Sequence, residues 1–221
     1  MVRISKQVWL LSCLIAVWPL MGLANAIEPQ TSKNTRYEIA YATYLGGVEN
    51  EFAEHRPWLG PEGALVLTGV SSSPDFPTTL GAVQRVLRGK NDGFIAKLSS
   101  NGKSFAFSGL LGGTGGEFFL MPTPDSEGNI FIVGQTSSLD FPITPDALQI
   151  ASRSAKRSRN GDGVVAVLSP DGSKVVYATF LGSSGEDLIR SVATGPYGEV
   201  YLVGSTSSRD FPVTSNAVRP N

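Results

Sequence analysis

An internal repeat constrains the fold of this chain more than any other feature of the sequence. Three landmarks recur in a fixed order: a Leu-Gly-Gly or Leu-Gly-Ser tripeptide, an apolar run between two glycines, and an Asp-Phe-Pro tripeptide. Between the second and third copies each landmark moves by 70 positions, and between the first and second by 65 or 66. A period of this length predicts one small supersecondary unit per copy, packed against the next unit. The three kinds of landmark begin at Leu45, Leu111 and Leu181, at Gly63, Gly128 and Gly198, and at Asp75, Asp140 and Asp210.

The pattern within a copy predicts four short strands. Residues 37–45 alternate in the way of a half-buried strand, and residues 64–68 form an apolar run typical of a strand buried on both faces. Asn-Gly and Asp-Gly between apolar runs indicate hairpins. We therefore expect 94–98 to pair with 105–111 across Asn101-Gly102, and 164–168 to pair with 175–181 across Asp171-Gly172. Weaker strands are expected at 118–121 and 188–193.

A Ser-Ser-x-Asp-Phe-Pro segment follows the apolar strand of each copy, in full or in part. Serine and aspartate side chains can bond nearby backbone amides and hold a turn, while proline restricts the residue before it. The phenylalanine is expected to wedge into the core between neighbouring sheets. Because these residues recur in every copy, we interpret them as structural and not as catalytic acids or bases: Asp75, Phe76, Pro77, Asp140, Phe141, Pro142, Asp210, Phe211 and Pro212.

Residues 144–149 are expected to form a short helical turn directly after this segment. Thr144 would be the N-cap and Pro145 the first helical residue. Residues 79–84 and 214–219 match this pattern loosely, without the proline.

The first 26 residues have the features of an export signal. Arg3 and Lys6 precede an apolar run, and Leu23-Ala24-Asn25-Ala26 supplies the small-x-small cleavage pattern. The run over 8–23 covers 16 positions, fewer than the roughly 20 of a spanning helix. An uncleaved anchor, or a lipid on Cys13, is therefore the less favoured alternative. We expect residues 27–36 to be a linker, and the mature protein to be secreted, periplasmic or on the cell surface, without a membrane span.

Removal of the signal would leave 195 residues with a net charge of −3 and no cysteine. Disulfides and thiolate metal sites are then excluded. The charge gives no reason to expect a nucleic-acid partner.

Four antiparallel strands per unit, with one aromatic plug, are typical of a β-propeller blade. We expect an all-β domain over 37–221 with about three blades, grouped approximately as 37–69, 93–134 and 163–204. A closed ring needs about four to eight blades, so the chain would be an incomplete propeller: a fragment of a longer reading frame, or an open arc. An open arc exposes apolar faces and favours a partner, and two or more copies closing one ring is an alternative.

The combined motifs resemble the bacterial β-propeller repeat family known as SBBP, over roughly residues 37–216. The resemblance implies an exported or cell-surface protein and supplies no catalytic residues. Glu51–Trp58 and Phe118–Pro124 depart from the family pattern, which puts the pairing of the second strand there in doubt. The residues that carry the resemblance are Tyr177-Ala178-Thr179-Phe180-Leu181-Gly182 with Gly185-Glu186-Asp187, the stretches 198–208 and 92–98, and Asp210-Phe211-Pro212.

The sequence offers few candidates for chemistry. His55 is the single histidine and lies in a polar stretch without a nucleophile motif, so an exposed loop residue is favoured over a catalytic base. The sequence lacks the cysteine and histidine ligands that zinc usually takes. The stretches 125–129 and 185–187 do not match a calcium loop, and no glycine-rich phosphate loop occurs. We expect no catalytic residue, metal or cofactor.

One basic cluster lies in the loop inserted into the second copy: Arg153, Lys156, Arg157 and Arg159. It could bind phosphate or an acidic polysaccharide, although a solvated loop is the favoured interpretation.

These observations predict an exported, non-catalytic β-propeller segment that acts as a binding or surface-structural module for a protein or polysaccharide. The alternative is a propeller-type lyase or glycosidase whose remaining blades lie outside this chain. Such an enzyme would bring paired carboxylates together in a central channel.

Overall fold

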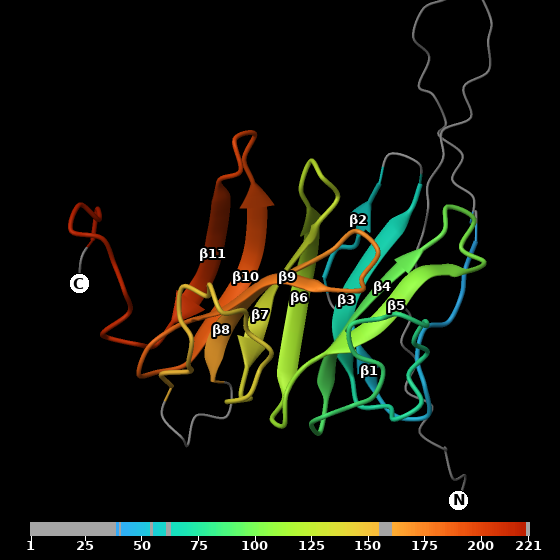
Figure 1. Ribbon diagram of the computed structural model, residues 1–221, viewed down its shortest axis with the longest axis horizontal. Coiled ribbons are helices and arrows are strands. Elements are labelled where there is room, and N and C mark those ends of the chain that lie inside the picture. The colour runs from blue at the N-terminus through green and yellow to red at the C-terminus, as the bar shows by residue number, and fades with distance from the viewer. Residues whose placement is uncertain (1–38, 40, 54, 61–62, 155–160, 220–221) are drawn as a thin grey trace, which may run out of the picture.

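The protein is an all-β assembly of short antiparallel strands (Figure 1). The computed structural model describes residues 39, 41–53, 55–60, 63–154 and 161–219, and this part of the chain contains no helix, and hence none that could cross a membrane. The expected signal and linker, residues 1–26 and 27–36, lie outside the described residues. The strands are β1 (Glu51–Phe52), β2 (Trp58–Leu59), β3 (Leu65–Ser71), β4 (Asp92–Leu98), β5 (Phe105–Leu111), β6 (Glu117–Pro124), β7 (Ile130–Thr136), β8 (Asp162–Leu168), β9 (Val175–Leu181), β10 (Asp187–Thr194) and β11 (Val200–Thr206).

The strands form three sheets. The first has the order β1-β3-β4-β5, with β2 also paired to β3; the second has the order β6-β7-β8-β9; the third consists of β10 and β11. Both expected hairpins are confirmed, because β4 pairs with β5 and β8 with β9. The turn glycines Gly102 and Gly172 adopt φ values of 66° and 69°, which a residue with a Cβ adopts only with strain.

The sheets divide the chain differently from the predicted grouping of 37–69, 93–134 and 163–204. They span 51–111, 117–181 and 187–206. The apolar strand β7 pairs with β8 in register from Ile130↔Leu168 to Thr136↔Asp162, across the whole Asp-Phe-Pro segment. Strands β5 and β6, by contrast, lie in different sheets, joined by the loop that begins at Gly112. Each sequence copy therefore contributes strands to two successive sheets.

The predicted strand over 37–45 is wrong for the residues that the structure describes there, 39 and 41–45. The corresponding segments of the later copies, β5 and β9, are held by the Asp-Gly strand that precedes each of them. Among the described residues, 39–45 has no such partner. Tyr41 nevertheless packs against the next unit, where a Cβ on Gly102 would overlap its ring, as a Cβ on Gly172 would overlap Phe107.

The weaker strands are confirmed and are longer than predicted, as β6 and β10. Strand β6 contains Pro122 and Pro124 and is irregular between Phe119 and Pro122. It lies at the edge of its sheet, a position where proline costs no ladder hydrogen bond on the open side. In the first copy the same stretch is divided into the two-residue strands β1 and β2.

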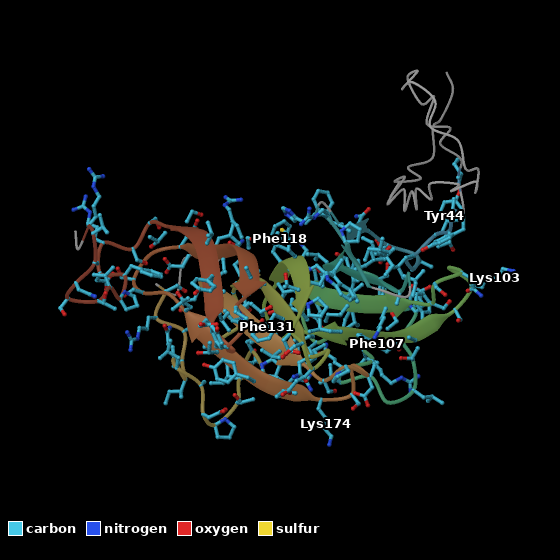
Figure 2. The ribbon with its side chains drawn as sticks, turned by 90° about the horizontal axis from the view of Figure 1, so that it is seen from above. Tyr44, Lys103, Phe107, Phe118, Phe131 and Lys174 are labelled. Atoms are coloured by element: carbon cyan, nitrogen blue, oxygen red, sulfur yellow. The ribbon has the colours of Figure 1, made fainter. Side chains whose placement is uncertain are left out.

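The sheets follow one another along the long axis of the molecule (Figure 1), with β6 packed on β3 and β4, and β10 packed on β7 and β8. Figure 2 shows the side chains that fill the space between them. The main core joins the first and second sheets, and Phe141 lies in it. A smaller core of Val133, Val165, Ile189 and Val192 joins the second and third. Phe76 belongs to a cluster of the first sheet with Phe94.

The predicted helical turn at 144–149 is wrong. The only turn hydrogen bond there runs from Ala147 N–H to the Thr144 carbonyl. Thr144 is not an N-cap, because its Oγ1 accepts from the N–H of Ala178 in β9 at 3.2 Å, where a cap would accept from an amide of its own turn. Its backbone N–H also donates to the carbonyl of Ala178, at 3.1 Å. Residues 79–84 are also bonded to an edge strand, since the N–H of Thr79 donates to the carbonyl of Ser108 in β5 at 2.8 Å. Residues 214–219 keep one turn bond, from Ala217 to Thr214. In the first two sheets these segments therefore cover the outer edge strand.

Candidate functional site

The recurring aspartate of each Asp-Phe-Pro segment binds a loop that lies 26 or 27 residues earlier in the chain. Asp140 Oδ1 accepts hydrogen bonds from Thr114 N–H at 2.8 Å and from the Thr114 hydroxyl at 2.9 Å. Asp75 accepts from Val48 N–H at 2.9 Å, and Asp210 from Ser184 N–H and hydroxyl at 3.3 and 2.5 Å. The hydroxyl bonds of nearby serines lower the pKa of Asp210 to about 2.

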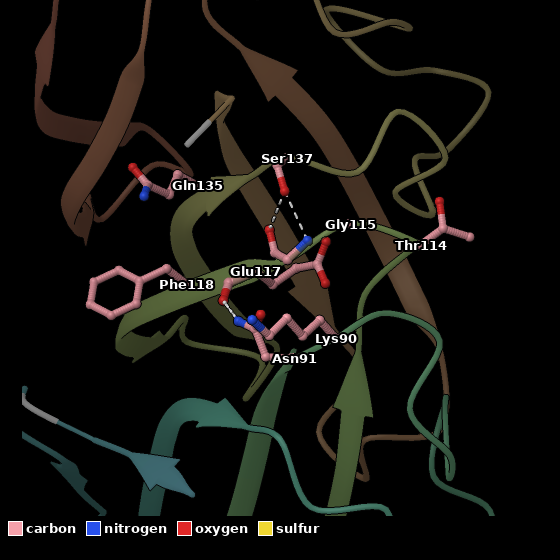
Figure 3. A pocket seen from close by; sticks show the side chains of 9 residues that line it. Lys90, Asn91, Thr114, Gly115, Glu117, Phe118, Gln135 and Ser137 are labelled. Carbon is pink, nitrogen blue, oxygen red and sulfur yellow. Dashed lines mark hydrogen bonds between the residues drawn. The ribbon is translucent and has the colours of Figure 1, made fainter. Parts of the chain in front are cut away.

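The serines of the segment bind the same loop. Ser137 Oγ accepts from Gly116 N–H at 2.8 Å (Figure 3). Ser138 Oγ accepts from Gly115 N–H, also at 2.8 Å. The third copy repeats this arrangement with Ser207 and Ser208. In the second and third copies the segment thus holds the loop that precedes β6 or β10, whereas we expected it to hold its own turn.

The three phenylalanines of the Asp-Phe-Pro segments occupy comparable positions, but their side chains are buried to different extents. Phe76 and Phe141 are buried, the first stacked near Phe94 and the second between Phe119 and Phe180. Phe211 is half-buried and lines an apolar pocket beside β10 and β11. Among the described residues, the third sheet consists of β10 and β11 alone, so no counterpart of β8 and β9 covers Phe211.

Two polar cavities lie where β6 and β10, the first strands of the second and third sheets, begin. The first, about 480 Å³, is lined by residues that include Lys90, Asn91, Glu117 and Gln135, and Asn91 donates to the Glu117 carbonyl at 2.9 Å (Figure 3). The second, about 300 Å³, occupies the corresponding position one sheet further on. Its lining comprises Gln135, Glu186, Asp187, Leu188, Arg190, Ser205, Thr206 and Ser207.

A buried pair of carboxyl groups lies near the loop that precedes β6, and a second pair lies near the loop that precedes β10. At the junction of the first and second sheets the pair is Asp92 and Glu117, because a Cβ on Gly112 would overlap an oxygen of each. Asp92 accepts hydrogen bonds from Gln84 Nε2 and from the N–H groups of Arg88 and Gly89.

Glu117 is 1% exposed, and its Oε1 accepts the hydroxyls of Thr136 and Ser138 at 2.6 and 2.5 Å. Its Oε2 is buried without a hydrogen-bond partner. Burial raises the pKa of Glu117 to about 7, and the nearby Asp92 charge acts in the same direction.

Asp162 and Asp187 form the corresponding pair at the junction of the second and third sheets. Their carboxyl oxygens Oδ1 and Oδ2, respectively, each lie 2.6 Å from the point that a Cβ on Gly182 would occupy. Both side chains are buried, and the Oδ1 atom of each has no hydrogen-bond partner. Asp162 Oδ2 accepts from Arg153 N–H at 2.6 Å, and Asp187 Oδ2 accepts from Ser183 N–H at 2.8 Å and from the Ser208 hydroxyl at 2.9 Å.

The remaining sequence candidates do not gather into a site. Of the basic cluster, only Arg153 is described, and its backbone holds Asp162; Lys156, Arg157 and Arg159 lie outside the described residues. His55 is half-buried in a loop. Asp125 forms a turn by accepting from the N–H groups of Glu127 and Asn129, which confirms the turn interpretation of 125–129. Within the described part of the chain, no three histidine, cysteine, aspartate or glutamate side chains come together.

Sequence reasoning missed the buried carboxyl pairs. A signal for them was present, because an acidic residue stands five positions after Gly46, Gly112 and Gly182, and an aspartate opens both Asp-Gly strands. Their convergence depends on contact between successive sheets, which the spacing alone does not specify.

An apolar cleft of about 460 Å³ lies between the outer half of the second sheet and β11, lined by residues that include Phe131, Val167, Tyr177 and Leu202. No family model matches this chain, and no similar sequence is found among curated proteins.

Proposed function

We propose that the chain is an exported, non-catalytic β-propeller segment of the SBBP type, and that it acts as a binding or surface-structural module. In this interpretation each sheet is one blade, and the third is a half-blade. The proposal is supported by the three stacked antiparallel units, because in each of them a serine of the Ser-Ser-x-Asp-Phe-Pro segment accepts from an amide of the same loop.

The observation that carries the binding role is the uncovered face of β11. Val133 in β7 and Val203 in β11 occupy corresponding positions, one before the glycine that ends the apolar run. Val133 is 0% exposed because the third sheet packs on it, whereas Val203 is 66% exposed. Tyr201, which corresponds to the partly buried Phe131, is exposed in the same way. The face is thus built like an internal surface of the stack.

We infer that the occupant of this face is a second copy of the chain. The other end of the stack, where Tyr44 lies (Figure 2), also exposes apolar side chains. Among them are Tyr44, Phe52 and Leu59. A contact between the two unlike ends is heterologous, and it closes a ring when the rotation per unit permits. Two copies of about three blades each would give a ring within the usual range of about four to eight.

Light scattering coupled to size exclusion, at micromolar concentrations, tests this proposal. The wild-type chain is expected to elute above the monomer mass, and Val203→Glu to elute as a folded monomer, because a charge would be buried in the contact. Val86→Glu is the matched control, since Val86 is a loop valine with 65% exposure, and it should associate like the wild type.

A soluble monomeric wild type would contradict self-association. Assembly that persists unchanged in Val203→Glu would contradict the role of the β11 face, and a different partner, such as a polysaccharide or further blades of the same repeat, would then be sought with the same variant pair.

The enzymatic alternative receives less support from the site. A lyase or glycosidase needs carboxyls that face a substrate. The carboxyl pairs of this protein are buried, and they recur at both junctions, as expected of parts that serve the stack.

A further inference from the structure

The geometry points to a divalent-cation site, best suited to Ca²⁺, between Asp162 of the second sheet and Asp187 of the third. The two carboxyls come from neighbouring sheets: Asp162 Oδ1 and Asp187 Oδ2 each lie 2.6 Å from the point that a Cβ on Gly182 would occupy. Asp187 Oδ1 is the second oxygen of the same carboxylate. This inference is independent of the proposed function, and it reverses the expectation that 185–187 holds no metal. The second ligand comes from the Asp-Gly motif of a different strand, so no local pattern could show it.

The first argument is the unsatisfied oxygen on each aspartate. Asp162 is 0% exposed and Asp187 is 1% exposed, yet Oδ1 of each accepts no hydrogen bond. Burying an unpaired carboxylate is costly, and buried charges in proteins are usually paired or coordinate a metal. Carboxylate oxygens are the ligands that Ca²⁺ prefers, and two such groups match its charge.

The second argument is the comparison with the first junction. Glu117 and Asp187 correspond, but the aspartate is one methylene shorter. Glu117 reaches the hydroxyls of both Thr136 and Ser138. Asp187 accepts the Ser208 hydroxyl, but no described hydrogen bond joins it to Thr206, the counterpart of Thr136. At the first junction only Glu117 Oε2 lacks a donor among the described residues, because Asp92 accepts hydrogen bonds through both of its oxygens. At the second junction Oδ1 of Asp162 and Oδ1 of Asp187 both lack one, which leaves two oxygens for another ligand.

The third argument is access. Asp187 lines the 300 Å³ cavity at the start of β10, whose other walls are largely polar and include Glu186 and Arg190. A cation could enter through this cavity, and water in it could complete the coordination sphere, which for Ca²⁺ takes six to eight oxygens. With only two carboxylates, the affinity should be in the weak class of extracellular modules, with a Kd on the order of 10⁻⁴ to 10⁻³ M.

Calorimetric titration of the full, chelator-treated chain with CaCl₂ at pH 7.5 tests the assignment. The wild type is expected to bind one Ca²⁺ and to gain thermal stability with it. Asp162→Asn and Asp187→Asn should lose the isotherm, and so should Asp187→Glu, which keeps the charge but fills the gap. Asp171→Asn, in an exposed turn, is the control and should bind like the wild type.

A wild type that binds no Ca²⁺ at up to about 10 mM, well above that affinity class, overturns the assignment. Binding that survives in any of the three site variants also overturns it. Thermal melts without Ca²⁺ show that a variant is folded, and Asp187→Asn should melt no lower than the wild type there, because it removes charge repulsion. A lower melting point for this variant in chelator would indicate that the pair is satisfied without a metal, and would also overturn it.

Discussion

At the scale of single residues, the two carboxyl pairs show how small differences around a repeated position change its chemistry. Glu117 reaches both hydroxyls above it and shares its site with an aspartate that three donors satisfy. It therefore meets its burial by holding a proton, as its raised pKa of about 7 indicates. In the second pair Oδ1 of Asp187 and Oδ1 of Asp162 both lack a donor within the described part of the chain, whereas in the first pair only Glu117 Oε2 does.

The titration of Glu117 should make stability depend on pH. Its folded pKa of about 7 lies above the ordinary value of 4.5, so the folded protein retains a proton that the unfolded chain releases in this interval. The free energy of unfolding should therefore fall as the pH rises from 4.5 to about 7, by at most about 3 kcal/mol. Glu117→Gln removes this titration, and urea denaturation across the interval measures the difference.

The expected result is that Glu117→Gln gains stability relative to the wild type as the pH rises. Glu127→Gln, in the exposed turn before β7, is the matched control and should follow the wild-type curve. Parallel curves for the wild type and Glu117→Gln would show that Glu117 titrates alike in the folded and unfolded chain.

At the scale of elements, the sequence predicted strands well and their grouping badly. Hairpins such as β4–β5 and β8–β9 are local, because an Asn-Gly or Asp-Gly turn specifies both strands and their contact. The pairing of β7 with β8 spans the 25 residues 137–161, and no turn motif signals it. The strand predicted for 39–45 is absent from the described residues there for the converse reason. The alternating pattern is present, but a segment forms a strand only when a neighbouring strand pairs with it. The helical turn at 144–149 failed because bonds to β9 replaced the helical ones.

Gln149 is the residue through which that segment holds β9. Its Oε1 accepts from Gly182 N–H at 3.1 Å, and its Nε2 donates to the Ala151 carbonyl at 2.9 Å. Gln84 makes the same kind of bonds in the first sheet. Gln149→Ala should lower the free energy of unfolding by about 2–3 kcal/mol, because buried partners are left unsatisfied. Gln135→Ala, in β7, should change it by less than about 0.5 kcal/mol, because the Gln135 side chain makes no hydrogen bond to the described residues.

Chemical denaturation of the two glutamine variants measures this difference. Equal losses in both would show that the amide of Gln149 does not fasten the segment to β9.

At the scale of the whole molecule, stability should decrease along the stack. Strand β8 lies inside the second sheet, and all its residues are buried. Strand β11 pairs on one side only, and its residues are exposed apart from Leu202, which is half-buried. Units that contact only their neighbours open from the less supported end.

Hydrogen exchange should resolve this gradient. The amides of β7 and β8 are expected to exchange slowest. Leaving aside the two-residue strands β1 and β2, the amides of β10 and β11 are expected to exchange fastest. The Val203→Glu variant is the form to measure, since association cannot then cover the third sheet. Uniform protection across the three sheets would contradict a graded stack and indicate a single cooperative unit.

The offset between sequence copies and sheets has a consequence for how such a protein can gain or lose length. Since Leu111 and Leu181 both lead from one sheet into the next, excising residues 112–181 would join two equivalent points of the backbone and remove one entire four-stranded sheet. The strands that remain would keep the neighbours to which they are hydrogen-bonded. Gene duplication or deletion in multiples of the period can therefore begin at any position of the repeat, and no strand is left without the pairing partners that a sheet provides.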